Sequence, residues 1–297
     1  MKLWRYNTHQ YTGTLGFLMT LYGALVAICL SASPLPADGA QADVLSIGGS
    51  VTEIVYALDK GRRLVARDST SIYPQAANGL PDVGYMRALS PEGVLAVAPA
   101  LILSEEGAGP PETIAALQAA AIPFITIPDA YDAEGVIAKV LAVGEALGAQ
   151  EQATVLARDV AAQFETLSER IKPQSTPKKV MFILSTSGGR ILASGTNTAA
   201  DGIIALAGGE NAMLGFEGYK SVTDEAVVAA APDVILMMDR TGDHATSNAA
   251  LFAMPALAPT PAAANQAIVR MNGLYLLGFG PRTAQATLDL NEALYGR

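Results

Sequence analysis

The chain has 297 residues, with 19 Lys+Arg against 28 Asp+Glu and a formal net charge of −9 at pH 7. Such an acidic chain argues against nucleic acid and anionic membrane surfaces as partners. One cysteine and two histidines leave little room for a disulfide framework, a histidine-rich zinc site or a nucleophilic triad. No set of acid and base residues in the sequence indicates an enzyme.

The N-terminal segment has the features of a secretory signal peptide. Lys2 and Arg5 form a short positive region, residues 15–30 form an apolar run, and Ala40-Gln41-Ala42 supplies a cleavage signal. We therefore expect residues 1–42 to be removed by cleavage near Ala42 and the mature protein to lie in the periplasm. An uncleaved membrane anchor is the alternative, because the apolar run is nearly long enough to span a bilayer.

Loss of this leader would leave 17 Lys+Arg against 27 Asp+Glu. Cys29 lies within the leader, and Ile28 stands before it where a lipoprotein signal needs a small residue. We therefore expect neither lipidation nor a disulfide. The stability of the mature chain must come from an apolar core, which its length readily supplies.

Beyond the leader, β-rich runs alternate with helical patterns, which is typical of α/β architecture with mostly parallel sheets. The strands predicted in the first half are residues 44–47, 64–66, 101–103 and 124–127. Ser50-Val51-Thr52-Glu53 has the spacing of a capping box and predicts a helix start. Helical periodicity then extends from 134 to 171, with a break at Leu147-Gly148, and Lys172-Pro173 ends it.

In the second half, the alternation of strands and helices starts again after Pro177. The predicted strands are residues 180–184, 234–238 and 275–277. The predicted helices are residues 198–207 and 283–294.

An internal repeat predicts two similar lobes. Residues 90–103 and residues 223–236 each have the pattern of a capped helix, a proline turn and a buried strand. A repeat distance of this length is too long for a solenoid. We predict two Rossmann-like lobes, 43–147 and 174–297, joined by a long rigid helix over 148–173. The ligand cleft should lie between the lobes, and the hinge motion should be small.

One loop that should face this cleft contains Tyr85 followed two residues later by Arg87. A phenolate oxygen suits ferric iron, and tyrosine is a known axial haem ligand. Ionising a phenol at pH 7 costs roughly 4 kcal/mol, and both coordination to Fe(III) and a nearby arginine favour the charged form. The alternative for a loop tyrosine is a packed or hydrogen-bonded ring. Tyr73 is the rival ligand, although no arginine follows it at this spacing.

Several segments resemble the periplasmic haem-binding proteins of bacterial haem ABC importers, which belong to a larger class that carries siderophores and cobalamin. They follow the family order through nearly the whole mature chain. The matching segments are residues 46–53, 66–71, 84–87, 198–201 and 277–283.

The resemblance implies a haem site. Tyr85 would be the axial ligand of the haem iron, Arg87 its hydrogen-bonding partner, and Arg240 a second-lobe arginine that reaches haem from the opposite wall. Ser187 stands where some family members have a histidine, which favours iron with a single protein ligand. His244 is the alternative source of a second ligand.

The resemblance also implies partners. Glu92 and Glu225 occupy equivalent helix starts in the repeat, and in the wider class one glutamate per lobe docks on arginines of the membrane permease. The alternative is that each glutamate only complements its helix N-terminus.

The expected protein is therefore a monomeric carrier without catalytic activity. It would bind ferric haem as its transported ligand and deliver it to the permease dimer of an ABC importer, with an outer-membrane haem receptor system as a further partner. A siderophore or cobalamin carrier on the same fold is the alternative within the binding class. A secreted hydrolase that uses carboxylates is the alternative from another class.

Overall fold

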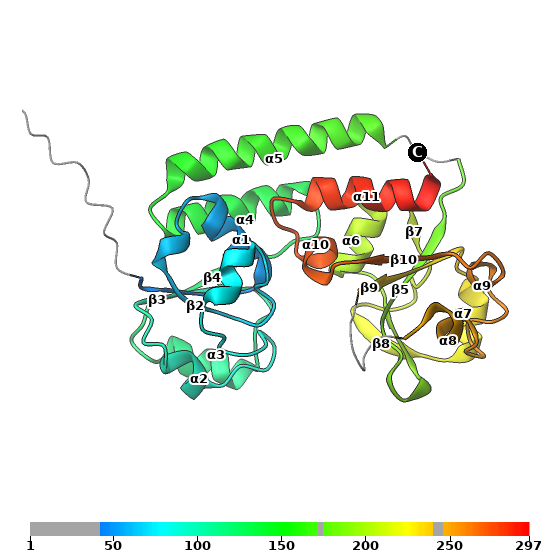
Figure 1. The fold of residues 1–297 in the computed structure, drawn as a ribbon, viewed down its shortest axis with the longest axis horizontal. Coiled ribbons are helices and arrows are strands. Elements are labelled where there is room, and N and C mark those ends of the chain that lie inside the picture. Colours follow the sequence, from blue (N-terminus) through cyan, green and yellow to red (C-terminus); the bar gives the residue numbers. More distant parts are fainter. Residues whose placement is uncertain (1–41, 172–174, 240–245, 297) are drawn as a thin grey trace, which may run out of the picture. The chain divides into compact units, whose positions relative to one another are not determined.

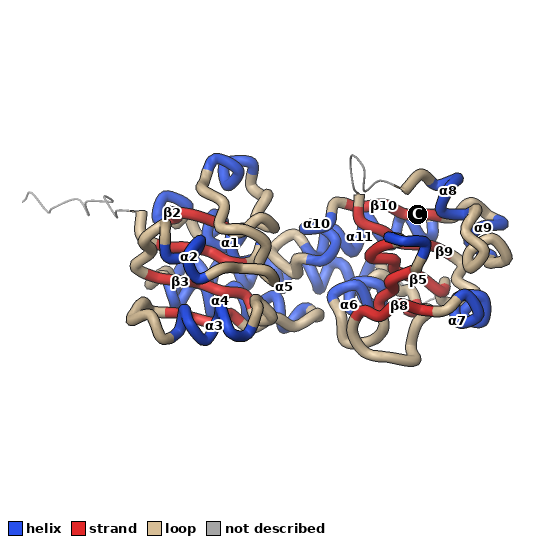
Figure 2. The backbone as a smooth tube through the Cα atoms, turned by 90° about the horizontal axis from the view of Figure 1, so that it is seen from below, coloured by secondary structure: helices blue, strands red, loops and turns tan. Residues whose placement is uncertain are grey.

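Two separate β-sheets organise the computed structural model, which describes residues 42–171, 175–239 and 246–296 (Figures 1 and 2). The first sheet has the strand order β2-β1-β3-β4, and every neighbouring pair is parallel. Its strands are β1 (Val44–Ile47), β2 (Leu64–Arg67), β3 (Leu101–Glu105) and β4 (Phe124–Ile127). β1 and β3 are buried along their whole length, as expected for central strands of a parallel sheet covered on both faces. The four strands predicted for this half are confirmed.

Six helical segments accompany the first sheet. They are α1 (Gly49–Ala57), η1 (Gly61–Arg63), η2 (Gln75–Gly79), α2 (Pro91–Leu95), α3 (Pro111–Gln118) and α4 (Ala133–Ala146). The predicted capping box at the start of α1 is wrong. The helix begins at Gly49 after Gly48, and no side chain caps it. The Ser50 hydroxyl donates to the Glu105 carboxylate instead, and the Thr52 hydroxyl forms a hydrogen bond with the Ser71 hydroxyl. Both hydroxyls thus use tertiary partners rather than the backbone of their own helix.

The second sheet has the order β10-β9-β5-β6-β8, with β7 paired to β5. Its strands are β5 (Lys179–Ser185), β6 (Ile191–Ser194), β7 (Glu210–Asn211), β8 (Tyr219–Val222), β9 (Val234–Met238) and β10 (Ile268–Met271). The pairs among β10, β9, β5 and β7 are parallel, whereas β6 pairs antiparallel with both β5 and β8. The predicted strands at 180–184 and 234–238 are confirmed, and the antiparallel part of the sheet was not predicted.

The described helical segments of the second lobe begin with η3 (Ser187–Gly189), and the others are α6 (Ala199–Leu206), α7 (Asp224–Ala230), α8 (Asn248–Phe252), α9 (Pro261–Ala264), α10 (Gly273–Leu277) and α11 (Thr283–Tyr295). The predicted strand at 275–277 is wrong, because these residues belong to α10. The Asn272 side-chain oxygen accepts a hydrogen bond from the Tyr275 amide at 3.1 Å, which fixes the first helical turn, and Leu276 is fully buried. A short apolar run does not by itself distinguish a buried helix from a strand.

The helix α5 (Gln150–Arg170) contributes to the cores of both lobes. Ala153 and Ala157 pack in the core of the first lobe, whereas Val160, Phe164 and Leu167 pack in the core of the second. The predicted break before α5 is confirmed at Leu147 and Gly148, where Gly148 has φ +65°. The rigidity of this helix and the lobe boundaries 43–147, 148–173 and 174–297 stay predictions.

The internal repeat is visible in the structure. Ser90 caps α2 by accepting from the Gly93 amide, and Thr223 caps α7 by accepting from the Ala226 amide. Each helix is followed by an alanine with positive φ, Ala98 at +47° and Ala231 at +44°, and then by β3 or β9. The two segments therefore share their caps and backbone turn as well as their sequence pattern.

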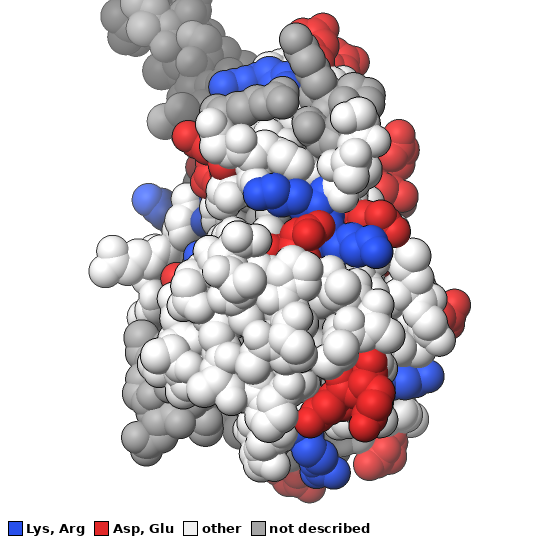
Figure 3. Space-filling model, turned by 90° about the vertical axis from the view of Figure 1, so that its right-hand side faces the viewer, with Lys and Arg blue, Asp and Glu red and all other residues white. Residues whose placement is uncertain are grey.

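Within the described residues, no helix combines the length and apolarity that crossing a membrane requires. Acidic and basic side chains are interspersed on the face drawn in Figure 3, and no single basic patch covers it.

Candidate functional site

The loop that carries Tyr85 is anchored by buried apolar side chains. Val83, Met86 and Leu89 belong to a core cluster of the first lobe, and Met86 is only 8% exposed. Tyr85, in contrast, is 48% exposed, and Arg87 is also exposed. The loop thus buries one set of side chains and leaves the phenol and the guanidinium accessible.

Backbone hydrogen bonds fix the same loop on the rest of the lobe. The Gly84 carbonyl accepts from the Ser69 amide, and the Met86 carbonyl accepts from the Gly109 amide, both at 2.9 Å. The Tyr85 carbonyl accepts from the Ala88 amide at 2.8 Å, which closes a turn around Tyr85 and Arg87. Gly84 has φ +100°, a conformation that glycine adopts readily and other residues rarely.

Asp68 organises the neighbouring backbone from a fully buried position. Its carboxylate accepts from the Gly48 amide at 3.0 Å, from the Thr70 amide at 2.9 Å and from the Ser71 hydroxyl at 2.6 Å. The Thr52 hydroxyl lies 2.6 Å from the Ser71 hydroxyl. The segments 46–53 and 66–71 therefore build the scaffold that holds the loops after β1 and β2.

Two tyrosines, one from each lobe, are influenced by the charge of Arg87. Tyr131 follows the carboxyl end of β4, and Tyr219 begins β8. Burial, assisted by the negative charge of Asp129, raises the pKa of Tyr131 to about 12, and the Arg87 cation works against this shift. Burial also raises the pKa of Tyr219, and Arg87 again opposes it. The Arg87 charge therefore favours ionisation of both phenols, against the effect of burial.

Tyr131 was not found from the sequence. Its position could have been inferred, because loops at the carboxyl ends of parallel strands meet at one edge of a sheet and form the usual ligand site of α/β proteins. The loops after β2 and β4 satisfy this geometry. Tyr219 has no comparable sequence signal, because it starts an antiparallel strand that was not predicted.

The rival tyrosine, Tyr73, is engaged elsewhere. The Arg282 guanidinium lies 3.6 Å from the centre of the Tyr73 ring. Arg282 also donates two hydrogen bonds of 2.8 Å to the Glu53 carboxylate. Tyr73 therefore takes part in a contact between the lobes, and its ring is 42% exposed.

The remaining predicted site residues are dispersed. Ser187 lies in η3, exposed at the carboxyl end of β5, where its backbone amide donates to the Ser185 hydroxyl at 3.1 Å. Glu92 and Glu225 are exposed at the starts of α2 and α7. The pKa of Glu225 is lowered, because its carboxylate accepts hydrogen bonds from its own backbone amide and from the Thr223 hydroxyl. Arg240 and His244 lie outside the described residues.

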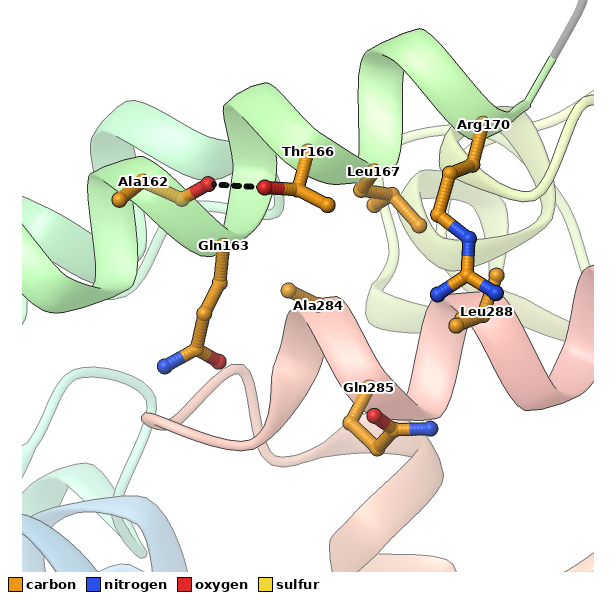
Figure 4. Close-up of a pocket in the computed structure, with 8 residues that line it drawn as sticks. All are labelled: Ala162, Gln163, Thr166, Leu167, Arg170, Ala284, Gln285 and Leu288. Atoms are coloured by element: carbon orange, nitrogen blue, oxygen red, sulfur yellow. Dashed lines mark hydrogen bonds between the residues drawn. The ribbon is translucent and has the colours of Figure 1, made fainter.

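A hollow of about 260 Å³ lies between α5 and α11 and contains none of the predicted site residues (Figure 4). Its lining residues are Ala162, Gln163, Thr166, Leu167, Arg170, Ala284, Gln285 and Leu288. The Thr166 hydroxyl donates to the Ala162 carbonyl of its own helix, so this polar side chain is already satisfied. We place the candidate site at the Tyr85 loop, which leaves the Tyr85 phenol and the Arg87 guanidinium exposed.

The fold and this site define a two-lobed α/β binding protein. Residues 44–273 match the model of the periplasmic binding protein family, and the chain belongs to this family. The prediction of a two-lobed α/β fold is thereby confirmed.

Solved structures of haem-binding proteins resemble this chain closely. The periplasmic heme-binding protein BhuT, in complex with two hemes, is 39% identical with a TM-score of 0.80, over 85% of this chain and 97% of that one. The periplasmic heme-binding protein RhuT from Roseiflexus sp. RS-1, in apo form, is 37% identical with a TM-score of 0.81, over 86% and 98%. A periplasmic heme-binding protein from Pseudomonas aeruginosa is 33% identical with a TM-score of 0.76, over 86% and 93%. The resemblance drawn from the sequence is confirmed.

More distant relatives carry other names. A vitamin B12-binding protein of Yersinia pseudotuberculosis is 28% identical over 250 residues, which cover 84% of this chain and 87% of that protein. An uncharacterised ABC transporter substrate-binding lipoprotein of Bacillus subtilis, YvrC, is 29% identical over 199 residues. That match spans 66% of this chain and 63% of the relative.

Proposed function

We propose that this chain is exported to the periplasm, where it captures ferric haem and delivers it to the permease of an ABC importer. The single observation that carries this proposal is the arrangement of Tyr85 and Arg87. Both side chains are exposed on a loop that is otherwise fixed by buried residues. The similarity to haem-binding proteins at 33–39% identity supports the same ligand.

In this proposal Tyr85 supplies the axial ligand of the iron. Phenolate is a hard anionic donor that suits ferric iron, and its formation at neutral pH needs help from nearby positive charge. Arg87 supplies that charge from two residues away. Burial keeps Tyr131 and Tyr219 protonated, because it raises the pKa of both groups. In this proposal the two protonated phenols would donate hydrogen bonds to the ligand.

The second lobe would complete the site. Arg240 would reach haem from the opposite wall, and Ser187 would leave the second axial position without a strong ligand. His244 is the alternative second ligand, and Tyr73 is the alternative to Tyr85. Siderophores and cobalamin are the alternative cargo, which the similarity to vitamin B12-binding proteins favours to a lesser extent.

Docking on the permease would use Glu92 and Glu225. Both are exposed, and they begin helices with the same cap and the same following turn. Leu95 and Val228 stand three residues further along these helices and are also exposed, at 39% and 43%. A pair of equivalent acidic and apolar positions fits a partner that presents the same basic surface twice.

Titration with haemin tests the proposal. The purified exported protein should develop a high-spin ferric spectrum with a phenolate charge-transfer band. Tyr85→Phe should abolish this band, because it removes the oxygen but keeps the ring. Tyr73→Phe is the matched variant and should leave the spectrum unchanged.

Three results would contradict the proposal. They are a wild-type protein that stays colourless with haemin, a Tyr85→Phe spectrum equal to that of the wild type, and the loss of the band in Tyr73→Phe instead. Cyanocobalamin and a ferric siderophore, added as competitors at the same concentration, should not displace haemin.

A further inference from the structure

One segment of the second lobe, Gly278–Arg282, makes polar contacts with the first lobe at both of its ends. It connects α10 to α11, and we call it the interlobe segment. Its last residue, Arg282, forms the two-pronged ion pair with Glu53 of α1. Glu53 is only 6% exposed, so this carboxylate is largely removed from water and depends on its partner.

The other end of the interlobe segment is held by a buried cation. Lys139 of α4 is fully buried, and its ammonium group lies 2.6 Å from carboxylate oxygens of both Glu105 and Asp129. It also donates to the Gly278 carbonyl at 3.3 Å. Burial alone would lower the pKa of Lys139, but the two carboxylates together raise it. Lys139 therefore stays charged and holds a backbone carbonyl of the opposite lobe.

Between these two ends lies Phe279, which is 1% exposed. Its ring meets the ring of Tyr131 edge to face, with centroids 5.4 Å apart. Gly202 of α6 packs so closely on Tyr131 that an added Cβ atom would collide with the Tyr131 carbonyl. Tyr131, a residue of the first lobe, is thus held by contacts with the second lobe.

We propose that Arg282 is a positioning residue for ligand capture. By tying the interlobe segment to α1, it sets the spacing of the two lobes before any ligand arrives, and it keeps Phe279 packed on Tyr131. Tyr73 contributes by stacking under the same guanidinium. The part of this inference that concerns haem rests on the proposed function, and the part that concerns lobe spacing does not.

The test compares Arg282→Ala with Arg63→Ala. Arg63 forms an ion pair of the same two-pronged kind with Asp43, at 2.9 and 2.8 Å, but within one lobe. Small-angle scattering of the ligand-free proteins should show a larger radius of gyration for Arg282→Ala only. Haem loss to an excess of a scavenger protein should become about tenfold faster in Arg282→Ala, which corresponds to about 1.4 kcal/mol. The visible spectrum of the haem complex should not change, because Tyr85 is intact.

Equal scattering profiles together with equal rates of haem loss in the two variants would overturn the inference. Arg282→Lys and Glu53→Gln are milder changes, and they decide the question by the same measurements if Arg282→Ala does not fold. A wild-type protein that binds no haem would remove the proposed function. The scattering of the ligand-free variants would still decide whether Arg282 sets the lobe spacing.

Discussion

Two arginine–tyrosine pairs in this molecule differ in what surrounds them. Arg282 stacks on Tyr73 and is neutralised by Glu53. Arg87 lies two residues from Tyr85 in an exposed turn, and the ion pairs found among the described residues do not include it. In the first pair the guanidinium is held by a carboxylate and an aromatic ring, whereas in the second pair the guanidinium is exposed. Residue type and spacing suggest a site, but the partners of each side chain decide which pair is free to bind.

The largest effect is expected from Lys139→Met, which tests how much the charged groups between the lobes contribute to stability. Removing the ammonium leaves the buried Glu105 and the half-buried Asp129 without their cation, and breaking such a cluster costs about 3–5 kcal/mol. Urea unfolding of the ligand-free protein measures the loss. The matched control is Lys179→Met at an exposed lysine, which should stay close to the wild type. The double variant Lys139→Met/Glu105→Gln should recover part of the loss, and no recovery would contradict the explanation.

Arg87→Ala tests whether the exposed arginine beside Tyr85 contributes to haemin binding. The affinity for haemin should fall by about 10- to 100-fold, because groups that support a metal ligand usually contribute this much. The unfolding midpoint should not change, since Arg87 is exposed. Arg62→Ala, at another exposed arginine of the same lobe, is the control and should bind haemin normally. A drop in stability without a drop in affinity would make Arg87 a structural residue like Arg282.

Tyr131 packs on Phe279 of the interlobe segment and is influenced by the Arg87 charge. Its ionisation should change the stability of the protein at alkaline pH. Its pKa is about 12 in the folded protein and about 10 in an ordinary phenol. Because the folded pKa is raised, this contribution to stability is complete below pH 10 and disappears as the pH rises to 12. The free energy of unfolding should therefore fall over this range. In Tyr131→Phe the slope of the free energy of unfolding against pH should be shallower by an amount that corresponds to about one proton. Urea unfolding at several pH values measures this slope. Identical slopes would rule out this role for Tyr131.

The smallest effect is expected from Ser187→Ala. If the Tyr85 and Arg87 pair holds the iron without a second-lobe ligand, haem affinity should stay within about twofold, as for most exposed substitutions. A haemin titration of this variant beside the wild type measures it. A large loss of affinity, or a changed spin state of the iron, would assign a ligand role to the second lobe.

Much of the fold could be predicted from local patterns. The runs 44–47, 124–127 and 234–238 form strands with those bounds. The first and third are largely buried, as expected for parallel strands covered on both faces. The residues at 275–277 were misassigned because a short apolar run also fits a buried helix. The capping-box spacing at Ser50 failed because its hydroxyl has a tertiary partner, Glu105, 55 residues away.

The site was predictable only where its residues are neighbours in sequence. Tyr85 and Arg87 stand two positions apart, so their combination could be recognised. The partners of Tyr131 and Lys139 could not be recognised in this way, because Arg87, Glu105 and Gly278 lie far from them along the chain. A lysine in the middle of an apolar helix pattern is a usable signal for a buried ion cluster, since lysine is rarely buried without partners.

The repeat of α2 and α7 is close but not identical, since Pro91 and Leu95 of one copy correspond to Asp224 and Val228 of the other. A partner assembled from two identical halves would meet this pair in two orientations that differ by half a turn. The twofold symmetry of such a partner would make the two orientations identical in energy. The sequence differences between the copies would therefore give each identical half of the partner a different lobe to contact, without favouring either orientation.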